Sequence, residues 1–417
     1  MQKQTIAIVG TLAESLVGFR GELIRDLVAS GHTVYAFVSE MTNAQQWRIM
    51  ELGAKPIRYS LSRLGVNPWR DLYTVYQLYR LFRHYQIDVS FCYFAKPVIY
   101  GTLAAKLANV PLRVGKIEGL GRPFTPGVNG FGFAQRLVQQ VQVALYRLSL
   151  RYCHHLFLLN QDDRQDLIDK HRIKTGHIHQ LNGIGLDLTY YQYHPPQIAP
   201  LKFVFVGRLL NEKGIRQFIA AAEQLKAEGV SAEFIVVGAP DRGKGSLSAR
   251  TLLDKVNAGI IVYPGKVDDV RQFLQKSSVF VLPSYYREGV PRSTQEAMAV
   301  GRAIITSDGP GCRETVLDGQ NGYLVKPRDV DSLVAAMRQY IEHPERVAQH
   351  GQLSYQLAQQ RYDVRRINLT IIRNIGLYHQ QLEVLVDNVV QLRARQAQVD
   401  VAPERETVSS LNSFVNN

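Results

Sequence analysis

The chain has 417 residues, more than a single hydrophobic core usually holds, so we expect two domains. Its content of 46% hydrophobic and 20% charged residues excludes a disordered or fibrous protein. The net charge of +13 is uneven: residues 1–195 carry 22 Lys/Arg against 13 Asp/Glu, whereas the rest carries 27 against 23. The excess in the first half favours either an anionic partner there or merely a solvated basic face.

Several classes of protein are disfavoured. No basic arm, zinc-finger spacing or aromatic RNA-binding signature is present, which argues against nucleic acid as a partner. The three cysteines are widely spaced, which argues against a disulfide framework or a zinc site and favours a reducing cytoplasm. The N-terminus is typical of a first strand rather than of a signal peptide, and no apolar run approaches the roughly 18 to 20 residues that span a bilayer.

Short apolar runs alternate with segments of helical period along most of the chain, as in doubly wound α/β domains. In the first half they predict helices at 22–30, 68–86 and 98–108, and strands at 5–10, 32–39, 54–60, 88–94, 112–119 and 155–160. In the second half they predict helices at 215–228, 268–275, 293–300 and 330–342, and strands at 202–208, 233–238, 259–265, 278–284, 303–308 and 322–325. The predicted fold class is therefore α/β, with two doubly wound domains that bind ligands in a cleft facing their strand carboxyl ends.

Three prolines interrupt the periodicity at Tyr193–Pro200, where we place the domain boundary. The first domain is then 1–195 and the second 196–380, and the last helix of the second is expected to pack back on the first. Residues 393–417 lack periodicity and are expected to be a disordered tail.

The segment from Pro283 to Val316 is the richest in candidate site residues. It follows an apolar strand and runs through a turn with Glu288, Gly289 and Val290 into a helix that carries Glu296. The N–H groups that open such a helix provide donors and positive potential for a diphosphate, and a glycine lets the backbone approach a ligand closely.

The same residues have a structural explanation. Ser293 to Glu296 reads S-T-Q-E, a capping box in which Glu296 would only satisfy the start of the helix. Glu288 alone would be an ordinary loop carboxylate exposed to solvent.

A second constellation favours the functional interpretation. Arg208 and Lys213 follow the first strand of the second domain, at the same sheet edge as the Glu288 loop. Two cations there suit a leaving nucleotide diphosphate, whose negative charge grows as the sugar bond breaks. The alternative is two exposed cations on a surface loop.

Together these segments resemble family 4 of the retaining glycosyltransferases, which have the GT-B fold, and within it the capsule and O-antigen branch. The similarity covers roughly residues 4 to 380, and its matching segments are 10–21, 96–101, 119–124, 182–187, 207–214, 288–296, 310–316, 318–325 and 361–366.

The resemblance implies roles for individual residues. Arg208 and Lys213 would hold the donor diphosphate, Glu288 the hydroxyls of the transferred sugar, and Glu296 the ribose. The nucleotide would also contact Gly289, Val290, Pro291, the Gly265–Val267 turn (Val267 beside the base) and Gly10.

In the first domain, the loop from Gly10 to Gly21 would face the diphosphate and the acceptor. Lys96 and Glu118–Arg122 would line the acceptor pocket. Relatives often have paired glycines in the first loop, whereas Gly10 is followed here by Thr11-Leu12-Ala13. The family generally needs no metal or cofactor, and no Asp-x-Asp motif is present.

The expected reaction moves a hexose or N-acetylhexosamine from a nucleotide diphosphate sugar, UDP-linked, to a lipid-linked or glycan acceptor. We expect front-face attack, in which a donor phosphate oxygen accepts the acceptor's proton. A GT-B-like nucleotide-sugar epimerase and a non-catalytic nucleotide-binding α/β protein are the alternatives. A nicotinamide dehydrogenase fits poorly, because GTLAES replaces G-x-G-x-x-G after the first strand.

Two segments, Trp69–Gln86 and Phe131–His155, have apolar or aromatic residues at helical spacing with arginines between them. Such helices lie on membrane surfaces, so a peripheral location on the inner face of the cytoplasmic membrane is predicted. The alternative is that both helices only face the core of an α/β layer.

Overall fold

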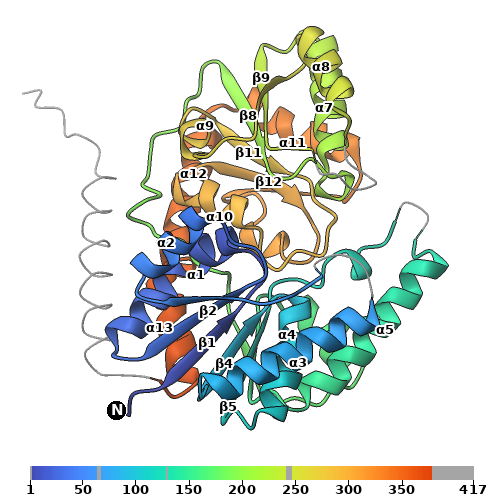
Figure 1. The fold of residues 1–417 in the computed structure, drawn as a ribbon. Coiled ribbons are helices and arrows are strands. Elements are labelled where there is room, and N and C mark those ends of the chain that lie inside the picture. Colours follow the sequence, from blue (N-terminus) through green and yellow to red (C-terminus); the bar gives the residue numbers. More distant parts are fainter. Residues whose placement is uncertain (1, 63–66, 128–129, 241–246, 378–417) are drawn as a thin grey trace, which may run out of the picture.

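A computed structural model describes residues 2–62, 67–127, 130–240 and 247–377, and two parallel sheets dominate it (Figure 1). The first sheet has the order β3-β2-β1-β4-β5-β6-β7, formed by β1 (Thr5–Val9), β2 (Thr33–Val38), β3 (Lys55–Arg58), β4 (Val89–Tyr93), β5 (Leu112–Ile117), β6 (His155–Leu158) and β7 (His177–Gln180). The second has the order β10-β9-β8-β11-β12-β13, formed by β8 (Leu201–Val206), β9 (Ala232–Val237), β10 (Val262–Gly265), β11 (Val279–Leu282), β12 (Ala303–Ser307) and β13 (Gly322–Val325). The predicted fold class is confirmed.

The helices of the first half form two groups. The group of α3 (Pro68–His84), α4 (Ala95–Leu107) and α5 (Phe133–Leu150) packs side by side, with α4 between the other two (Figure 1). The other group is α1 (Ala13–Ala29) with α2 (Asn43–Glu51). Because helices cover the sheet, its central strands are buried almost throughout, and continuous apolar runs predict them well.

The second half is covered in the same way. Helices α7 (Ile215–Ala227) and α11 (Val330–Glu342) pack together, and α10 (Arg292–Ala299) packs on α12 (Glu345–Arg361). The shorter α8 (Ala249–Asn257) contacts β10, and α9 (Arg271–Gln275) lies between β10 and β11 in the chain.

Residues 181–200 connect the two sheets without a regular element, and the boundary predicted at 193–200 lies in this connection. After α12 the chain returns to the first half, where α13 (Val364–Asn374) packs on α1. The Asn368 amide donates to Asp26 Oδ2 at 2.8 Å across this contact. The tail predicted at 393–417 lies outside the described residues.

One prediction about the first half is wrong. The loop expected from Gly10 to Gly21 is only three residues long, because α1 begins at Ala13. Ala13, Glu14 and Leu16 favour a helix, and this outweighs the cost of Gly18 and Gly21 inside it. Only the first turn of α1 therefore remains near the end of β1.

No helix in the part of the chain that the structure describes is long and apolar enough to cross a membrane.

Candidate active site

The two predicted constellations of the second half meet at the carboxyl ends of β8 and β11. The carbonyl oxygen of Glu212, in the short turn Asn211–Lys213, accepts hydrogen bonds from the N–H groups of Tyr285 (2.9 Å) and Tyr286 (3.0 Å). This backbone contact places the side chain of Lys213 beside the loop that carries Glu288.

Lys213 and Glu288 form an ion pair. The Lys213 ammonium contacts Glu288 Oε1, and the Ser284 hydroxyl donates to the same oxygen at 3.0 Å. Glu288 is only 8% exposed, and the Lys213 side chain is 14% exposed. Glu288 is therefore not a solvated loop carboxylate, and Lys213 is not an exposed lysine. Arg208, in contrast, is exposed, as the alternative of two exposed cations on a surface loop expected.

Glu296 does not cap its helix. The helix begins at Arg292 after Pro291, which makes no side-chain capping bond, so Glu296 lies in the second turn and not the first. Its Oε1 accepts instead from the Tyr191 hydroxyl (2.8 Å) and from Arg292 Nε (2.8 Å). The capping-box alternative is wrong, because the helix starts one residue before Ser293 and leaves this serine no orphan N–H to cap.

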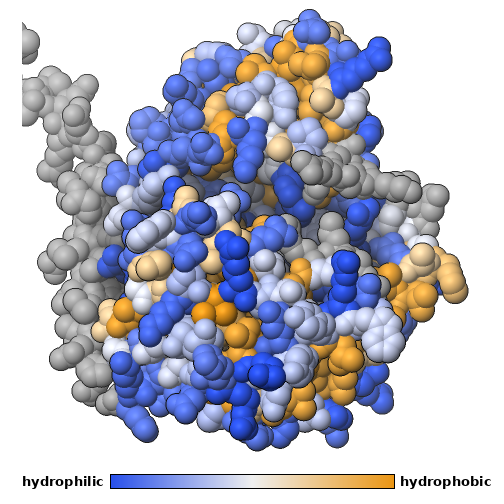
Figure 2. Space-filling model, in the orientation of Figure 1, coloured by the Kyte–Doolittle hydropathy of each residue, from blue (hydrophilic) through white to orange (hydrophobic). Residues whose placement is uncertain are grey.

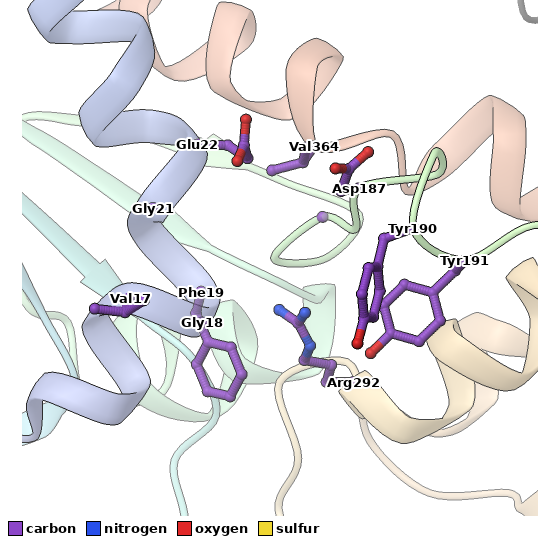
Figure 3. A pocket seen from close by; sticks show the side chains of 11 residues that line it. Val17, Gly18, Phe19, Gly21, Glu22, Asp187, Tyr190, Tyr191, Arg292 and Val364 are labelled. Atoms are coloured by element: carbon purple, nitrogen blue, oxygen red, sulfur yellow. The ribbon is translucent and has the colours of Figure 1, made fainter. Parts of the chain in front are cut away.

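Tyr191 and Arg292 also line a pocket of about 280 Å³ between the two halves (Figure 3). The pocket lies between α1, the 185–191 connection and the starts of α10 and α13. Arg292 projects into it, with its guanidinium carbon 4.6 Å from the centre of the Phe19 ring (Figure 3). Phe19, Tyr191 and Arg292 were not identified from the sequence, because residues more than a hundred positions apart meet here.

Gly289, Val290 and Pro291 are buried, and Gly289 packs against the first half of the chain. A Cβ atom on Gly289 would lie 2.7 Å from Leu159 Cδ1 and 2.8 Å from the carbonyl carbon of Glu118. The missing side chain therefore lets the first half approach this loop, whatever else the loop binds.

Gly10 directly follows β1, and Val267 follows β10 after one residue, Lys266. A Cβ on Gly10 would clash with the buried ring of Tyr93, 2.0 Å from its hydroxyl oxygen. Val267 is partly buried after β10, and the neighbouring Lys266 approaches Glu14 of α1 at 3.8 Å. The start of α1 thus faces the turn after β10 across the two halves.

The residues predicted to line the acceptor pocket hold partners of their own. The Lys96 ammonium lies 3.1 Å from Asp71 Oδ1 and donates to the Ser62 carbonyl at 2.7 Å. Glu118 is buried between two cations: it contacts Arg20 directly, and Lys116 Nζ lies 3.4 Å from its Oε1.

Burial is the main cause of the shifted pKa values of the two cations beside Glu118. It lowers the pKa of Arg20 to about 10, and it lowers the pKa of Lys116 well below its ordinary value. Neither cation was identified from the sequence, because each lies among apolar residues in its own element.

Among the described residues, no group of three or more His, Cys, Asp or Glu side chains is placed to hold a metal ion.

Comparison with known proteins identifies the family. Residues 200–343, which include Arg208, Lys213, Glu288 and Glu296, match the family described as Glycosyl transferases group 1. Residues 200–343 therefore form a domain of this family. The family predicted from the sequence is thereby confirmed.

Two bacterial relatives extend the similarity beyond this domain. The first is N,N'-diacetylbacillosaminyl-diphospho-undecaprenol alpha-1,3-N-acetylgalactosaminyltransferase of Campylobacter jejuni. The two sequences are 29% identical over 343 residues, and the alignment covers 79% of this chain and 87% of that protein. It is 25% identical over 284 residues to UDP-Gal:alpha-D-GlcNAc-diphosphoundecaprenol alpha-1,3-galactosyltransferase of Escherichia coli, covering 64% of this chain and 70% of that protein.

Solved glycosyltransferase structures have the same fold. Sucrose-phosphate synthase of Thermosynechococcus elongatus superposes with a TM-score of 0.72 at 18% identity and covers 90% of this chain and 99% of its own. Anabaena HepE, solved in complex with UDP and glucose, superposes with a TM-score of 0.71 at 17% identity and covers 90% and 100%. At these identities the likeness concerns the fold, and it agrees with the predicted GT-B arrangement.

Proposed function

We propose that this glycosyltransferase moves a hexose or N-acetylhexosamine, with retention, from a UDP-linked sugar to a lipid-linked or glycan acceptor in surface polysaccharide synthesis. The observation that carries this proposal is the Lys213–Glu288 pair where the β8 and β11 loops meet. A cation for a diphosphate and a carboxylate for sugar hydroxyls are thereby held side by side. The names of the Campylobacter and Escherichia coli relatives, both of which contain a diphospho-undecaprenol sugar, support the acceptor class.

We assign the donor contacts as follows. Arg208 and Lys213 stabilise the diphosphate as negative charge develops on it, so no metal ion or cofactor is required. Because both contacts to Glu288 use Oε1, its Oε2 is assigned to the hydroxyls of the transferred sugar.

The nucleotide is assigned to the second half. Glu296 accepts from the ribose, the backbone of Gly289–Pro291 faces the diphosphate, and Val267 lies beside the base. Gly10 marks the end of β1 that faces the diphosphate from the other half.

The chemical step then needs no enzyme nucleophile. The bond from the anomeric carbon to the diphosphate oxygen breaks, and the acceptor oxygen bonds to the same face of that carbon. The acceptor's proton passes to the departing diphosphate oxygen. Glu288 is a poor nucleophile here, because Lys213 and Ser284 already bind its Oε1.

Product analysis tests the reaction class. The enzyme is incubated with individual UDP-sugars and polyprenyl diphosphate sugars, and the products are identified by mass spectrometry and NMR. We expect an acceptor lengthened by one α-linked sugar. An epimerised free nucleotide sugar would indicate the epimerase alternative, and nucleotide binding without any turnover would indicate a non-catalytic module.

Glu296 provides a prediction about nucleotide affinity. Glu296→Gln is expected to weaken UDP binding about tenfold, because a neutral amide is a poorer acceptor for ribose hydroxyls than a carboxylate. Titration calorimetry measures the affinity. The matched variant Tyr191→Phe removes one existing partner of Glu296 and keeps its charge, so it should bind UDP at least as well as wild type. Unchanged affinity in Glu296→Gln would contradict the assignment.

We also propose that the outer faces of α3 and α5 dock on an anionic membrane. On α3, one exposed stripe carries apolar and aromatic side chains followed by two arginines: Trp69 (81% exposed), Leu72, Tyr73, Tyr76, Arg80 and Arg83. On α5, the exposed residues include Phe133 (86% exposed), Arg136, Leu137, Val138 and Val141. Figure 2 shows hydrophobic surface where α5 reaches the edge of the molecule.

The charges on these helices select the partner. The sequence of α5 contains no Asp or Glu, and the single carboxylate of α3, Asp71, is buried against Lys96. A face with arginines, Trp and Tyr and without exposed carboxylates suits anionic lipid head groups, and it would repel a second copy of itself.

The N-terminal ends of both helices adjoin the acceptor side of the site. Asp71 in the first turn of α3 pairs with Lys96, and Gln135 in the first turn of α5 donates to the Arg122 carbonyl at 3.0 Å. The most exposed ends of both helices therefore adjoin the segments expected to bind the acceptor. Docking there would bring a lipid-linked acceptor to the enzyme.

Vesicle sedimentation tests the docking. Binding to vesicles with anionic lipid is expected to fall with added salt, and to fall at least about tenfold in Arg80→Gln/Arg83→Gln, since each basic residue near the surface contributes about 1 kcal/mol. The control Arg250→Gln/Lys276→Gln removes the same charge from exposed positions of the second half and should bind like wild type. Equal binding to neutral and anionic vesicles, or none, would end the proposal.

A further inference from the structure

The loop that carries Glu288 is held by the first half of the chain at three consecutive residues. The Arg287 N–H donates to the Thr125 hydroxyl at 2.9 Å, and the Arg287 carbonyl accepts from the Gly121 N–H at 3.2 Å. The carbonyls of Glu288 and Gly289 both accept from the Asn160 amide, at 3.2 and 2.6 Å. The backbone of Glu288 thus belongs to the first half's hydrogen-bond network, whereas its carboxylate faces Lys213 of the second half.

A buried ion pair anchors the same loop. Arg287, 11% exposed at its side chain, lies 3.1 Å from Asp163 Oδ1 and 2.8 Å from Asp166 Oδ2. Asp163 is fully buried, and burial raises its pKa to about 7 while the charge of Arg287 opposes the increase. A buried carboxylate is costly unless a cation and hydrogen bonds satisfy it, so Asp163 strongly favours the arrangement in which Arg287 is docked.

Asn160 connects these two sets of contacts. It is fully buried after β6 and caps the short helix α6 (Gln161–Asp163): its Oδ1 accepts from the Asp163 N–H at 2.7 Å. Its amide nitrogen lies 3.1 Å from Asp163 Oδ2 and also reaches the two carbonyls of the Glu288 loop. One side chain therefore orients both the carboxylate that binds Arg287 and the backbone of Glu288.

We propose that Asn160, Asp163 and Arg287 are positioning residues of the first half and the Glu288 loop that align Glu288 for sugar transfer. The proposal rests on the assignment of Glu288 to the transferred sugar. In our assignment the first half binds the acceptor. The same half would also hold Glu288, the residue that binds the donor sugar. The carboxylate of Glu288 is then correctly placed only while these contacts hold the loop.

A second pair of charges between the halves provides a matched comparison. Arg313 Nη1 lies 3.3 Å from Asp162 Oδ2, and this pair is more exposed, at 40% and 25% for the two side chains. Arg313 lies in the turn Arg313–Thr315, outside the loop that carries Glu288. If ion pairs matter only by holding the halves together, the two pairs should behave alike.

The experiment compares kcat for sugar transfer, KM for the donor and Kd for UDP in Arg287→Ala, Asp163→Asn and the double variant. Each single variant is expected to lower kcat up to about 10²-fold, the loss that small misplacements cause, while the Kd for UDP stays near the wild-type value. The double variant should be no worse than the poorer single variant, because both changes remove the same contact. Arg287→Lys, which keeps the charge but cannot bridge Asp163 and Asp166, should fall between wild type and Arg287→Ala.

Arg313→Ala and Asp162→Asn are expected to retain most of the wild-type kcat. Equal losses in both pairs would overturn the positioning role, as would wild-type kcat in folded Arg287→Ala.

Hydrogen exchange provides a readout that does not depend on sugar transfer. The amides of residues 286–290 should exchange faster in Asp163→Asn and at the wild-type rate in Arg313→Ala. An unchanged exchange rate of these amides in Asp163→Asn would overturn the proposal. This test still holds if Arg287→Ala fails to fold. Absence of transfer by the wild-type enzyme with faster exchange in Asp163→Asn would reject the proposed function and leave the anchoring of the loop supported.

Discussion

Replacing Lys213 with alanine is expected to lower kcat for sugar transfer about 10²-fold, the effect of removing one preorganised group that stabilises developing charge. It is also expected to lower the free energy of unfolding by about 1–3 kcal/mol, because Glu288 would remain buried without its cation. Steady-state kinetics and thermal unfolding measure the two effects.

Arg208→Ala separates the two effects. Arg208 is exposed, so its loss should lower kcat by a similar factor and leave the melting temperature near that of wild type. The control Lys255→Ala breaks another Lys–Glu pair of the second half, with Glu223, outside the candidate site. Wild-type turnover in both Lys213→Ala and Arg208→Ala would contradict the assignment of the diphosphate contacts.

The strands were largely predictable because each central strand of a parallel sheet is buried on both faces. Runs such as Val279–Leu282 are continuously apolar, and no helical period competes with them. The strand His177–Gln180 was missed because it lies at the edge of its sheet, where three of its four residues (H-I-H-Q) are polar and all remain at least partly exposed. The first turns of α1 were missed because a glycine after a strand suggests a longer loop than the chain forms.

The candidate site was predictable only where its residues are local in sequence. Glu288 and Lys213 could be placed at one sheet edge because each follows a recognisable strand. The partners of Glu296 and of the Glu288 loop could not: Tyr191 is 105 residues from Glu296, and Asn160 is 128 residues from Glu288. Such pairs arise from the packing of the two halves, and no spacing within one segment indicates them.

The capping-box alternative shows how a local motif misleads. The sequence S-T-Q-E fits a cap by spacing alone, but a cap also requires the serine to be the last residue before the helix. Pro291 fixes the backbone one residue before Arg292, so the helix starts before Ser293 and frees Glu296 to contact Tyr191.

Glu288→Gln is expected to abolish most sugar transfer while leaving nucleotide binding nearly intact. The amide keeps the shape of the side chain and the contact with Ser284, but it removes the charge that binds both Lys213 and the sugar hydroxyls. We expect kcat to fall about 10²-fold and the Kd for UDP to change little, because UDP lacks the transferred sugar. The control Glu223→Gln neutralises the carboxylate of the distant Lys255 pair and should keep wild-type kinetics. Parallel losses of kcat and UDP affinity in Glu288→Gln would place this carboxylate on the nucleotide instead, and wild-type kcat would remove it from the site.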